Sequence, residues 1–297
     1  MHPAIAVRGL RKAFGRQIVL DGIDLEVAAG SVFALLGANG AGKTTTINIL
    51  TTLIRPDAGT AAVCGVEVTR DPVAVRRRIS LTGQSAAVDD LLTAKENLVM
   101  MGRLSGLRPR HAGQRATELL DRFGLAAAAG KRVGAYSGGM RRRLDLALSF
   151  VVTPAVLFLD EPTTGLDTRS RRELWDVIRA LAAAGTTVFL TTQYLEEADR
   201  LADRIAVLEA GRVVASGPAS VLKAQVGGDT VELHDHHGEL LREIHTDGTV
   251  AGVRAALDTL DETGAEGIVT VRRPSLDDVF LALTAPGGTA AERKEIA

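Results

Sequence analysis

The stretch GANGAGKTTT, which begins at Gly37, combines three glycines, one lysine and three threonines. Its spacing, Gly37 and then Gly42-Lys43-Thr44, fits the pattern GxxxxGK[ST]. Glycines let such a loop fold back so that backbone N–H groups point inward, and the next helix directs its positive N-terminal end to the same place. The sequence therefore predicts a phosphate cradle, in which Lys43 neutralises β/γ-phosphates, the Thr44 hydroxyl holds Mg²⁺ and Thr45 adds a donor.

Two carboxylates follow the apolar run AVLFL further along the chain. Asp160 stands at the end of this run, where a ligand of an open α/β sheet would lie, and we interpret it as the metal carboxylate. Its neighbour Glu161 can orient or deprotonate an attacking water. Alone, such a pair more often ends a strand without chemistry, but its combination with the glycine loop favours a site that hydrolyses a nucleoside triphosphate.

A third stretch, YSGGM, opens a predicted helix shortly before the Asp160 strand. A serine and two glycines at a helix start can form an anion site, with the Ser137 hydroxyl and the Gly138 and Gly139 amides as donors. A plain helix cap is the alternative interpretation of the same residues. The chain would thus have two phosphate sites for one nucleotide.

Short apolar runs bounded by glycine or proline predict the strands that position these motifs, at residues 31–37, 155–162 and 186–193. Between the last two runs, residues 169–185 place leucine, valine and isoleucine on one side of a helix that ends at a glycine. Strands that alternate with helices indicate an α/β fold with a mainly parallel sheet.

The chain divides into segments that differ in predicted secondary structure and in composition. We expect a nucleotide-binding domain over residues 1–224, with a helical insertion over about 90–152. A small α+β accessory domain over 225–285 follows, in the order strand, strand, helix, strand, and the polar residues 286–297 form a tail.

Composition limits the classes of partner. The 35 basic and 36 acidic residues leave a formal charge of -1, so no global field favours nucleic acid, and we expect no nucleic-acid partner. The single cysteine, Cys64, cannot form an internal disulfide, and the N-terminus lacks the apolar run of a signal peptide, which favours the cytoplasm. No window reaches the roughly 18 consecutive apolar residues that a membrane-spanning helix needs.

The glycine octet, YSGGM, LFLDEP, the GLD that ends at Asp167, and Gln84 in LTGQ stand in an order that resembles the nucleotide-binding subunit of ABC transporters, over residues 1 to about 224. The segments TTQYLEEAD and PSLDDVFLAL further resemble the drug-exporter ATPases of the daunorubicin/doxorubicin-resistance type. No NKxD-like motif, which would favour a GTPase, is found.

The resemblance implies a P-loop NTPase core with an antiparallel β subdomain, and the hydrolysis of ATP to ADP and phosphate with Mg²⁺. It implies a homodimer in which each of two ATPs lies between the lysine loop of one copy and the YSGGM corner of the other. It also implies an integral-membrane permease as partner, a place on the cytoplasmic face of the membrane, and export of a hydrophobic drug, antibiotic or lipid. A soluble ABC ATPase that acts on ribosomes or DNA is the alternative.

Other residues take their roles from the resemblance. Phe14 matches the aromatic on which adenine stacks, although a core phenylalanine is nearly as good an interpretation. Gln84 matches the residue that contacts Mg²⁺ and the attacking water, and that links ATP to the permease. Asp167 would contact the partner copy, and Gln193 stands where the family usually has a histidine near the γ-phosphate. The other expected contacts of the loop with phosphate are Asn39 and Gly40.

Overall fold

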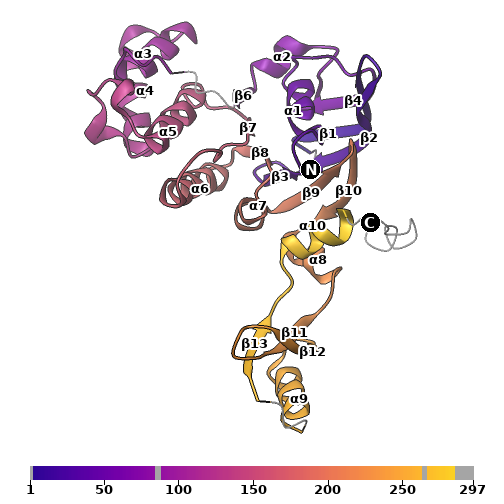
Figure 1. The fold of residues 1–297 in the computed structure, drawn as a ribbon. Coiled ribbons are helices and arrows are strands. Elements are labelled where there is room, and N and C mark those ends of the chain that lie inside the picture. Colours follow the sequence, from indigo (N-terminus) through magenta and orange to yellow (C-terminus); the bar gives the residue numbers. More distant parts are fainter. Residues whose placement is uncertain (1–2, 84–87, 263–265, 285–297) are drawn as a thin grey trace. The chain divides into compact units, whose positions relative to one another are not determined.

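A computed structural model of the chain describes residues 3–83, 88–262 and 266–284. Two compact units make up the chain, Met1–Ser216 and Gly217–Ala297 (Figure 1). Helix α8 (Ala219–Ala224) therefore belongs to the second unit, whereas the sequence analysis placed it with the first.

A six-stranded sheet in the order β10-β9-β3-β8-β7-β6 forms the centre of the first unit. The pairs β6–β7, β7–β8, β3–β8 and β3–β9 are parallel. Every residue of β3, β7 and β8 is buried, as their unbroken apolar runs predict. The strands are β3 (Val32–Leu36), β6 (Ile79–Thr82), β7 (Val156–Asp160), β8 (Thr187–Thr192), β9 (Arg204–Glu209) and β10 (Arg212–Gly217). The structure thus confirms the mainly parallel sheet.

A second sheet of the first unit has the order β2-β1-β4-β5, with antiparallel pairing throughout. Its strands are β1 (Ile5–Phe14), β2 (Gln17–Val27), β4 (Ala58–Val63) and β5 (Val66–Glu67). Apolar residues of β1 and β2 share one buried core cluster with Phe33, Phe158 and Phe189 of the central sheet. This common core holds the loop after β3 beside the antiparallel sheet.

Helices follow the strands of the first unit as the predicted α/β alternation requires. They are α1 (Lys43–Leu50), α2 (Pro72–Arg76), α3 (Ala94–Leu104), α4 (Pro109–Arg122), α5 (Gly138–Ser149), α6 (Thr168–Ala183) and α7 (Leu195–Leu201), with short 3₁₀ turns η1 (Ala126–Ala128) and η2 (Val133–Ala135). Helices α3, α4 and α5 pack against one another and form the predicted helical insertion (Figure 1). Thr93 and Glu96 exchange hydrogen bonds in a capping box that starts α3.

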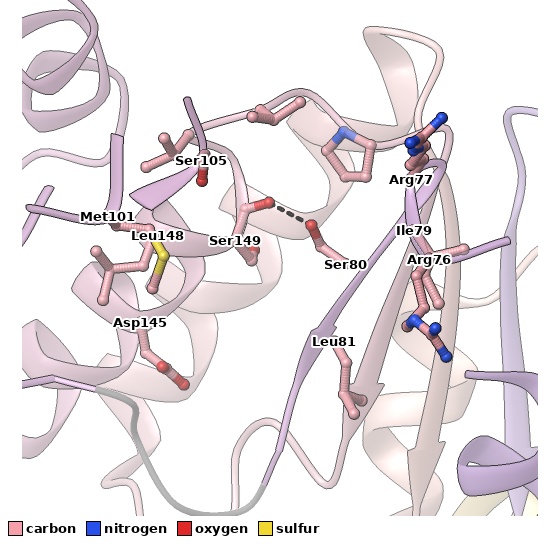
Figure 2. A pocket seen from close by; sticks show the side chains of 13 residues that line it. Arg76, Arg77, Ile79, Ser80, Leu81, Met101, Ser105, Asp145, Leu148 and Ser149 are labelled. Atoms are coloured by element: carbon pink, nitrogen blue, oxygen red, sulfur yellow. Dashed lines mark hydrogen bonds between the residues drawn. The ribbon is translucent and has the colours of Figure 1, made fainter. Parts of the chain in front are cut away.

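Helix α5 also packs against β6, the strand that precedes Gly83. The Ser80 hydroxyl of β6 donates to the Ser149 carbonyl oxygen at the end of α5, over 2.7 Å (Figure 2). The helical insertion is thereby tied to the edge of the central sheet.

The second unit contains a three-stranded sheet in the order β12-β11-β13. Its elements are α8, β11 (Asp229–His234), β12 (Leu240–Thr246), α9 (Val250–Asp261), β13 (Ile268–Arg272) and α10 (Leu276–Thr284). Val231 and Leu233 of β11 pack against Ala256 and Leu260 of α9, and α10 packs against α8. This is the α+β module that the sequence predicts. Within the residues that the structure describes, no helix is both long and apolar enough to span a bilayer.

Candidate nucleotide-binding and hydrolysis site

The loop between β3 and α1 has the geometry that its glycines permit. Gly42 caps α1 with φ 111° and ψ 6°, in the region that side chains disfavour. A Cβ atom there would also lie 2.7 Å from a Leu20 methyl carbon and 2.8 Å from the Val19 carbonyl oxygen. A glycine is therefore required where the loop turns into the helix, and the backbone N–H groups at the start of α1 stay open to an anion.

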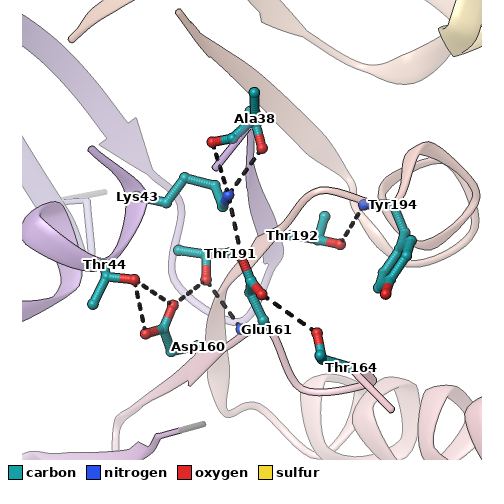
Figure 3. A network of polar contacts seen from close by, with 10 residues as sticks. Ala38, Lys43, Thr44, Asp160, Glu161, Thr164, Thr191, Thr192 and Tyr194 are labelled. Atoms are coloured by element: carbon teal, nitrogen blue, oxygen red, sulfur yellow. Dashed lines mark hydrogen bonds and ion pairs between the residues drawn. The ribbon is translucent and has the colours of Figure 1, made fainter. Parts of the chain in front are cut away.

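The ammonium group of Lys43 lies inside this loop (Figure 3). It donates to the carbonyl oxygens of Gly37 (2.9 Å) and Ala38 (3.1 Å), and it lies 3.2 Å from the carboxylate of Glu161. The Lys43 side chain is only 4% exposed and that of Glu161 is 11% exposed. The ammonium group is therefore held within the loop by contacts with the protein.

A cluster of oxygens links α1 to the ends of β7 and β8 (Figure 3). The register of the two parallel strands places Asp160 beside Thr191. The Thr191 hydroxyl donates to the Asp160 carboxylate over 2.6 Å, and the Thr44 hydroxyl donates to the same carboxylate over 3.0 Å. A buried carboxylate beside a hydroxyl is the oxygen donor set that suits a hard cation such as Mg²⁺.

Glu161 has an unusual backbone. Its φ of 48° lies in the left-handed region, which is costly for a residue with a side chain and persists only where the surroundings fix it. The Glu161 amide donates to the Thr191 hydroxyl over 3.1 Å, and the Thr164 hydroxyl donates to its carboxylate over 3.4 Å. The strained backbone turns this carboxylate out of the strand direction and toward Lys43.

Lys43, Thr44 and Glu161 face one pocket of about 530 Å³, within the size range of small-molecule sites. Its walls combine the antiparallel sheet, the glycine loop and the end of β7. The lining residues are Phe14, Gln17, Val19, Asn39, Gly40, Gly42, Lys43, Thr44, Thr45 and Glu161. The pocket thus unites eight of the sixteen predicted site residues, and it adds Gln17 and Val19, whose types carry no chemical signal.

Phe14 is not a core residue. It is 52% exposed at the end of β1, and the Lys12 ammonium lies 5.4 Å from its ring centroid. An exposed aromatic face beside a phosphate cradle is suited to stack a base. This position favours the adenine-stacking interpretation.

Seven other predicted site residues are described by the structure but do not line this pocket, namely Gly37, Ser137, Gly138, Gly139, Asp160, Asp167 and Gln193. Gln193 directly follows β8 and is half-buried, two positions after the Thr191 that donates to Asp160. Gln84 lies outside the described residues, but Gly83 before it is described. The contact between Lys43 and Glu161 does not depend on where these two glutamines lie.

The YSGGM stretch starts α5 as predicted. Ser137 caps the helix, and its hydroxyl accepts a hydrogen bond from the Met140 amide over 3.3 Å. Ser137 and Gly138 are exposed, while Tyr136 is buried and donates its hydroxyl to the Ala128 carbonyl oxygen. No residue of this corner lines the pocket that holds Lys43. Its donors thus remain available to a group outside that pocket.

Asp167 caps α6 and is exposed. The Ser170 amide and hydroxyl each donate to its carboxylate over 2.8 Å, and these hydrogen bonds lower the pKa of Asp167. The same Ser170 hydroxyl packs on Gly139, where a Cβ atom would lie only 2.5 Å from it. Ser170 therefore joins the Asp167 turn to the YSGGM corner, a contact that neither motif reveals in the sequence.

Comparisons with known proteins agree with this site. The family model described as ABC transporter matches residues 20–164. The chain is 50% identical to the daunorubicin/doxorubicin resistance ATP-binding protein DrrA of Streptomyces peucetius, over 95% of this chain and 92% of that protein. It is 45% identical to the doxorubicin resistance ATP-binding protein DrrA of Mycobacterium tuberculosis, over 95% and 93%. It is 39% identical to the Nod factor export ATP-binding protein I of Burkholderia lata, over 94% and 96%.

Solved structures are similar to the larger unit. An ATP-binding subunit of an ABC transporter matches with a TM-score of 0.66 and 28% identity, over 75% of this chain and 92% of the other. The ADP conformation of an ATP-binding cassette of an ABC transporter matches with a TM-score of 0.67 at 23% identity, over 73% and 92%, which bears on the fold alone. Both agree with the P-loop NTPase architecture that the sequence predicts.

Proposed function

Because the chain belongs to the ATP-binding proteins of the ABC transporter family, we propose that it is the ATP-hydrolysing subunit of an exporter whose permease is a separate membrane protein. Membership confirms the resemblance given by the motifs, and with it the activity of an ATPase. The observation that carries the proposal is the convergence of Lys43, Thr44, Asp160 and Glu161 from two elements at one site.

Each group of the site has a task in hydrolysis. Lys43 exchanges its carbonyl contacts for the β/γ-phosphates of ATP. The hydroxyl of Thr44 and the carboxylate of Asp160, together with Gln84, would hold Mg²⁺, which would supply positive charge beside the phosphates. Phe14 stacks on adenine, and the loop residues Asn39, Gly40, Gly42 and Thr45 line the pocket beside it.

Glu161 is the general base in this proposal. A carboxylate turned toward the phosphate end of the pocket can accept a proton from the attacking water. Gln193 contacts the γ-phosphate through its amide, which can donate a hydrogen bond but cannot carry a proton. The proton therefore goes to Glu161.

The working form is a homodimer around two ATPs. Ser137 and Gly138 are exposed and lie outside the lining of the pocket, so a second copy can present them to the ATP bound at Lys43. A two-fold axis gives each copy one loop and one YSGGM corner to contribute. Asp167, exposed and tied to this corner through Ser170, lies at the same interface. ATP closes the dimer, and hydrolysis reopens it.

A groove between α3, α5 and β6 is the docking place for the permease. Its volume is about 430 Å³, and its lining combines arginines with apolar side chains, of which Leu81 and Val152 are exposed (Figure 2). The residues are Arg76, Arg77, Ile79, Ser80, Leu81, Met101, Ser105, Asp145, Leu148, Ser149, Val151, Val152 and Pro154. A short amphipathic segment of a permease fits such a groove, and docking keeps the chain at the cytoplasmic face of the membrane.

The cargo is a hydrophobic drug, an antibiotic or a lipid. Relatives at 50% and 45% identity carry names of resistance to daunorubicin and doxorubicin, and one at 39% is named for Nod factor export. These names support export over import.

Co-expression of the chain with candidate permeases in membranes tests the proposal. We expect the chain to co-purify with one permease, and its ATPase rate to rise when that permease and a transported compound are present. A chain that is recovered with ribosomes or DNA instead, and whose ATPase rate rises with them, would contradict the proposal and favour the alternative.

A further inference from the structure

Arg142 is a buried arginine on α5 whose guanidinium contacts the turn that contains Glu161. Its Nε donates to the Pro162 carbonyl oxygen over 2.8 Å, and its Nη2 lies 3.5 Å from the Asp160 carbonyl oxygen. These two carbonyl groups flank Glu161 on either side. The residue is only 8% exposed, so the contacts form away from competing water.

The same guanidinium also holds the segment that leads to Gln84. Its Nη1 donates to the Gly83 carbonyl oxygen over 2.7 Å, directly before Gln84 in the sequence. One side chain thus joins the YSGGM helix, the turn of Glu161 and the end of β6. A planar guanidinium with five donors can make such divergent bonds, whereas a lysine ammonium cannot span them.

A carboxylate connects this arginine to the groove between α3, α5 and β6. Asp145 lies one turn along α5, and its Oδ2 is 3.2 Å from Arg142 Nη1. Asp145 also lines the groove, where Figure 2 shows it on the side of α5 that faces β6. Whatever occupies the groove can therefore act on Asp145, and Asp145 is in contact with Arg142.

We propose that Arg142 is a positioning residue that fixes the strained backbone of Glu161 for hydrolysis. Through its contact with Arg142, Asp145 makes this positioning sensitive to a permease segment in the groove. A positive φ at Glu161 needs surroundings that hold it, and Arg142 binds the carbonyl groups on both sides. The role of Asp145 rests on the proposed function, whereas the role of Arg142 concerns hydrolysis itself.

The first experiment measures ATPase kinetics of the full chain with Arg142→Gln, Arg142→Lys and the control Arg143→Gln. Arg143 is the next residue on the helix and is also partly buried, but it pairs with Glu173 of α6 (3.0 Å). We expect Arg142→Gln to lower kcat at least tenfold while KM for ATP changes less than twofold, because the lysine loop is left intact. Arg142→Lys, which keeps the charge beside Asp145, gives an intermediate kcat, and Arg143→Gln changes kcat less than twofold.

A double-mutant cycle separates positioning from a structural role. If Arg142 acts through Glu161, then Arg142→Gln causes no further loss of turnover in a Glu161→Gln background. A multiplicative loss in that background, an equal loss in Arg143→Gln, or a rise in KM without a fall in kcat would overturn the proposal for Arg142. If Arg142→Gln does not fold, as thermal unfolding would reveal, the same criteria apply to Arg142→Lys.

The second experiment measures the ratio of permease-stimulated to basal kcat for Asp145→Asn. We expect this ratio to fall by at least half, with Arg143→Gln again as control. A wild-type ratio retained in Asp145→Asn would overturn the coupling role. A wild-type chain that no permease stimulates would instead contradict the proposed function, and the kinetics of Arg142→Gln would still test the positioning of Glu161.

Discussion

The proposed function assigns proton acceptance to Glu161 and a hydrogen bond to the γ-phosphate to Gln193, and this difference gives a prediction at the scale of single residues. Since an amide cannot take up a proton near neutral pH, hydrolysis depends on the Glu161 carboxylate. We expect Glu161→Gln to lower kcat by about 10²-fold or more and to leave ATP affinity within a few-fold. Gln193→Ala lowers kcat by about tenfold or less, since it removes one hydrogen bond to phosphate. Single-turnover kinetics and equilibrium binding measure both, and near-normal turnover in Glu161→Gln with none in Gln193→Ala would contradict the assignment.

The contact between Gly139 and Ser170 gives a second prediction. A methyl group at Gly139 would lie 2.5 Å from the Ser170 hydroxyl and 2.7 Å from its Cβ, so Gly139→Ala overpacks the corner. We expect it to destabilise the chain by about 1–3 kcal/mol, and a Ser170→Gly background to remove most of that cost. Urea unfolding of the two single variants and the double variant measures the coupling. Additive losses would show that the two residues do not share this space.

The geometry of the site was predictable from sequence where a motif requires one backbone conformation. Gly42 must turn with a positive φ, and Asp160 ends a buried strand, so spacing alone locates both. Arg142 was not predictable in this way. Basic runs on helices such as Arg141 to Arg143 are most often solvated, and only the packing of α5 on β6 decides which arginine is buried. The spacing of Arg142 and Asp145, three residues apart on a helix, was the available signal.

At the scale of elements, the unbroken apolar runs determine β3, β7 and β8, because strands buried on both faces need no alternation. The junction near α8 was harder to predict. Glycines at 227 and 228 indicate a boundary, but α8 packs with α10, whose residues come some fifty positions later. A long-range contact of this kind leaves no local pattern.

The packing of α6 against α7 gives a prediction with a pH dependence. Trp175 of α6 donates its ring N–H to Glu197 of α7 over 3.0 Å, and Glu197 is fully buried. Burial raises the pKa of Glu197, although the hydrogen bond from Trp175 acts in the other direction. The folded state therefore binds this proton more tightly than the unfolded state. The contribution of Glu197 to stability is greatest below the unfolded pKa of about 4.5 and falls as pH rises toward the folded pKa.

Glu197→Gln removes this cost and keeps the shape of the side chain. We expect it to raise the free energy of unfolding at pH 8 by an amount on the order of 1 kcal/mol, and the gain to shrink toward pH 4.5. Urea unfolding at several pH values measures the difference. Asp176→Asn, an exposed position next to Trp175, serves as control. A gain that grows as the pH falls would mean that Glu197 is held ionised by its partners.

At the scale of the whole molecule, the proposed function gives the chain two separate sites for one ligand. The lysine loop lines one pocket with Glu161, whereas Ser137 and Gly138 are exposed at the start of α5 and are not part of that pocket. The lysine loop alone, or the YSGGM corner alone, would contact only part of a nucleoside triphosphate. In the proposed homodimer, two copies related by a two-fold axis would supply a complete set of contacts to each of two nucleotides, so association would depend on ATP.

We expect the full chain with Glu161→Gln, which binds ATP but does not hydrolyse it, to form dimers at saturating ATP and Mg²⁺ and to remain monomeric with ADP. Adding Ser137→Glu places a negative charge where the partner's γ-phosphate would approach, so like charges repel and the dimer dissociation constant rises at least about tenfold. Thr117→Glu, which adds the same charge at an exposed position on α4, leaves the dimer unchanged. Sedimentation velocity over a range of concentrations measures all three. Because Ser137 lies outside the pocket, ATP binding to the monomer stays intact in Ser137→Glu, and equal dimerisation of the two charged variants would exclude the YSGGM corner from the interface.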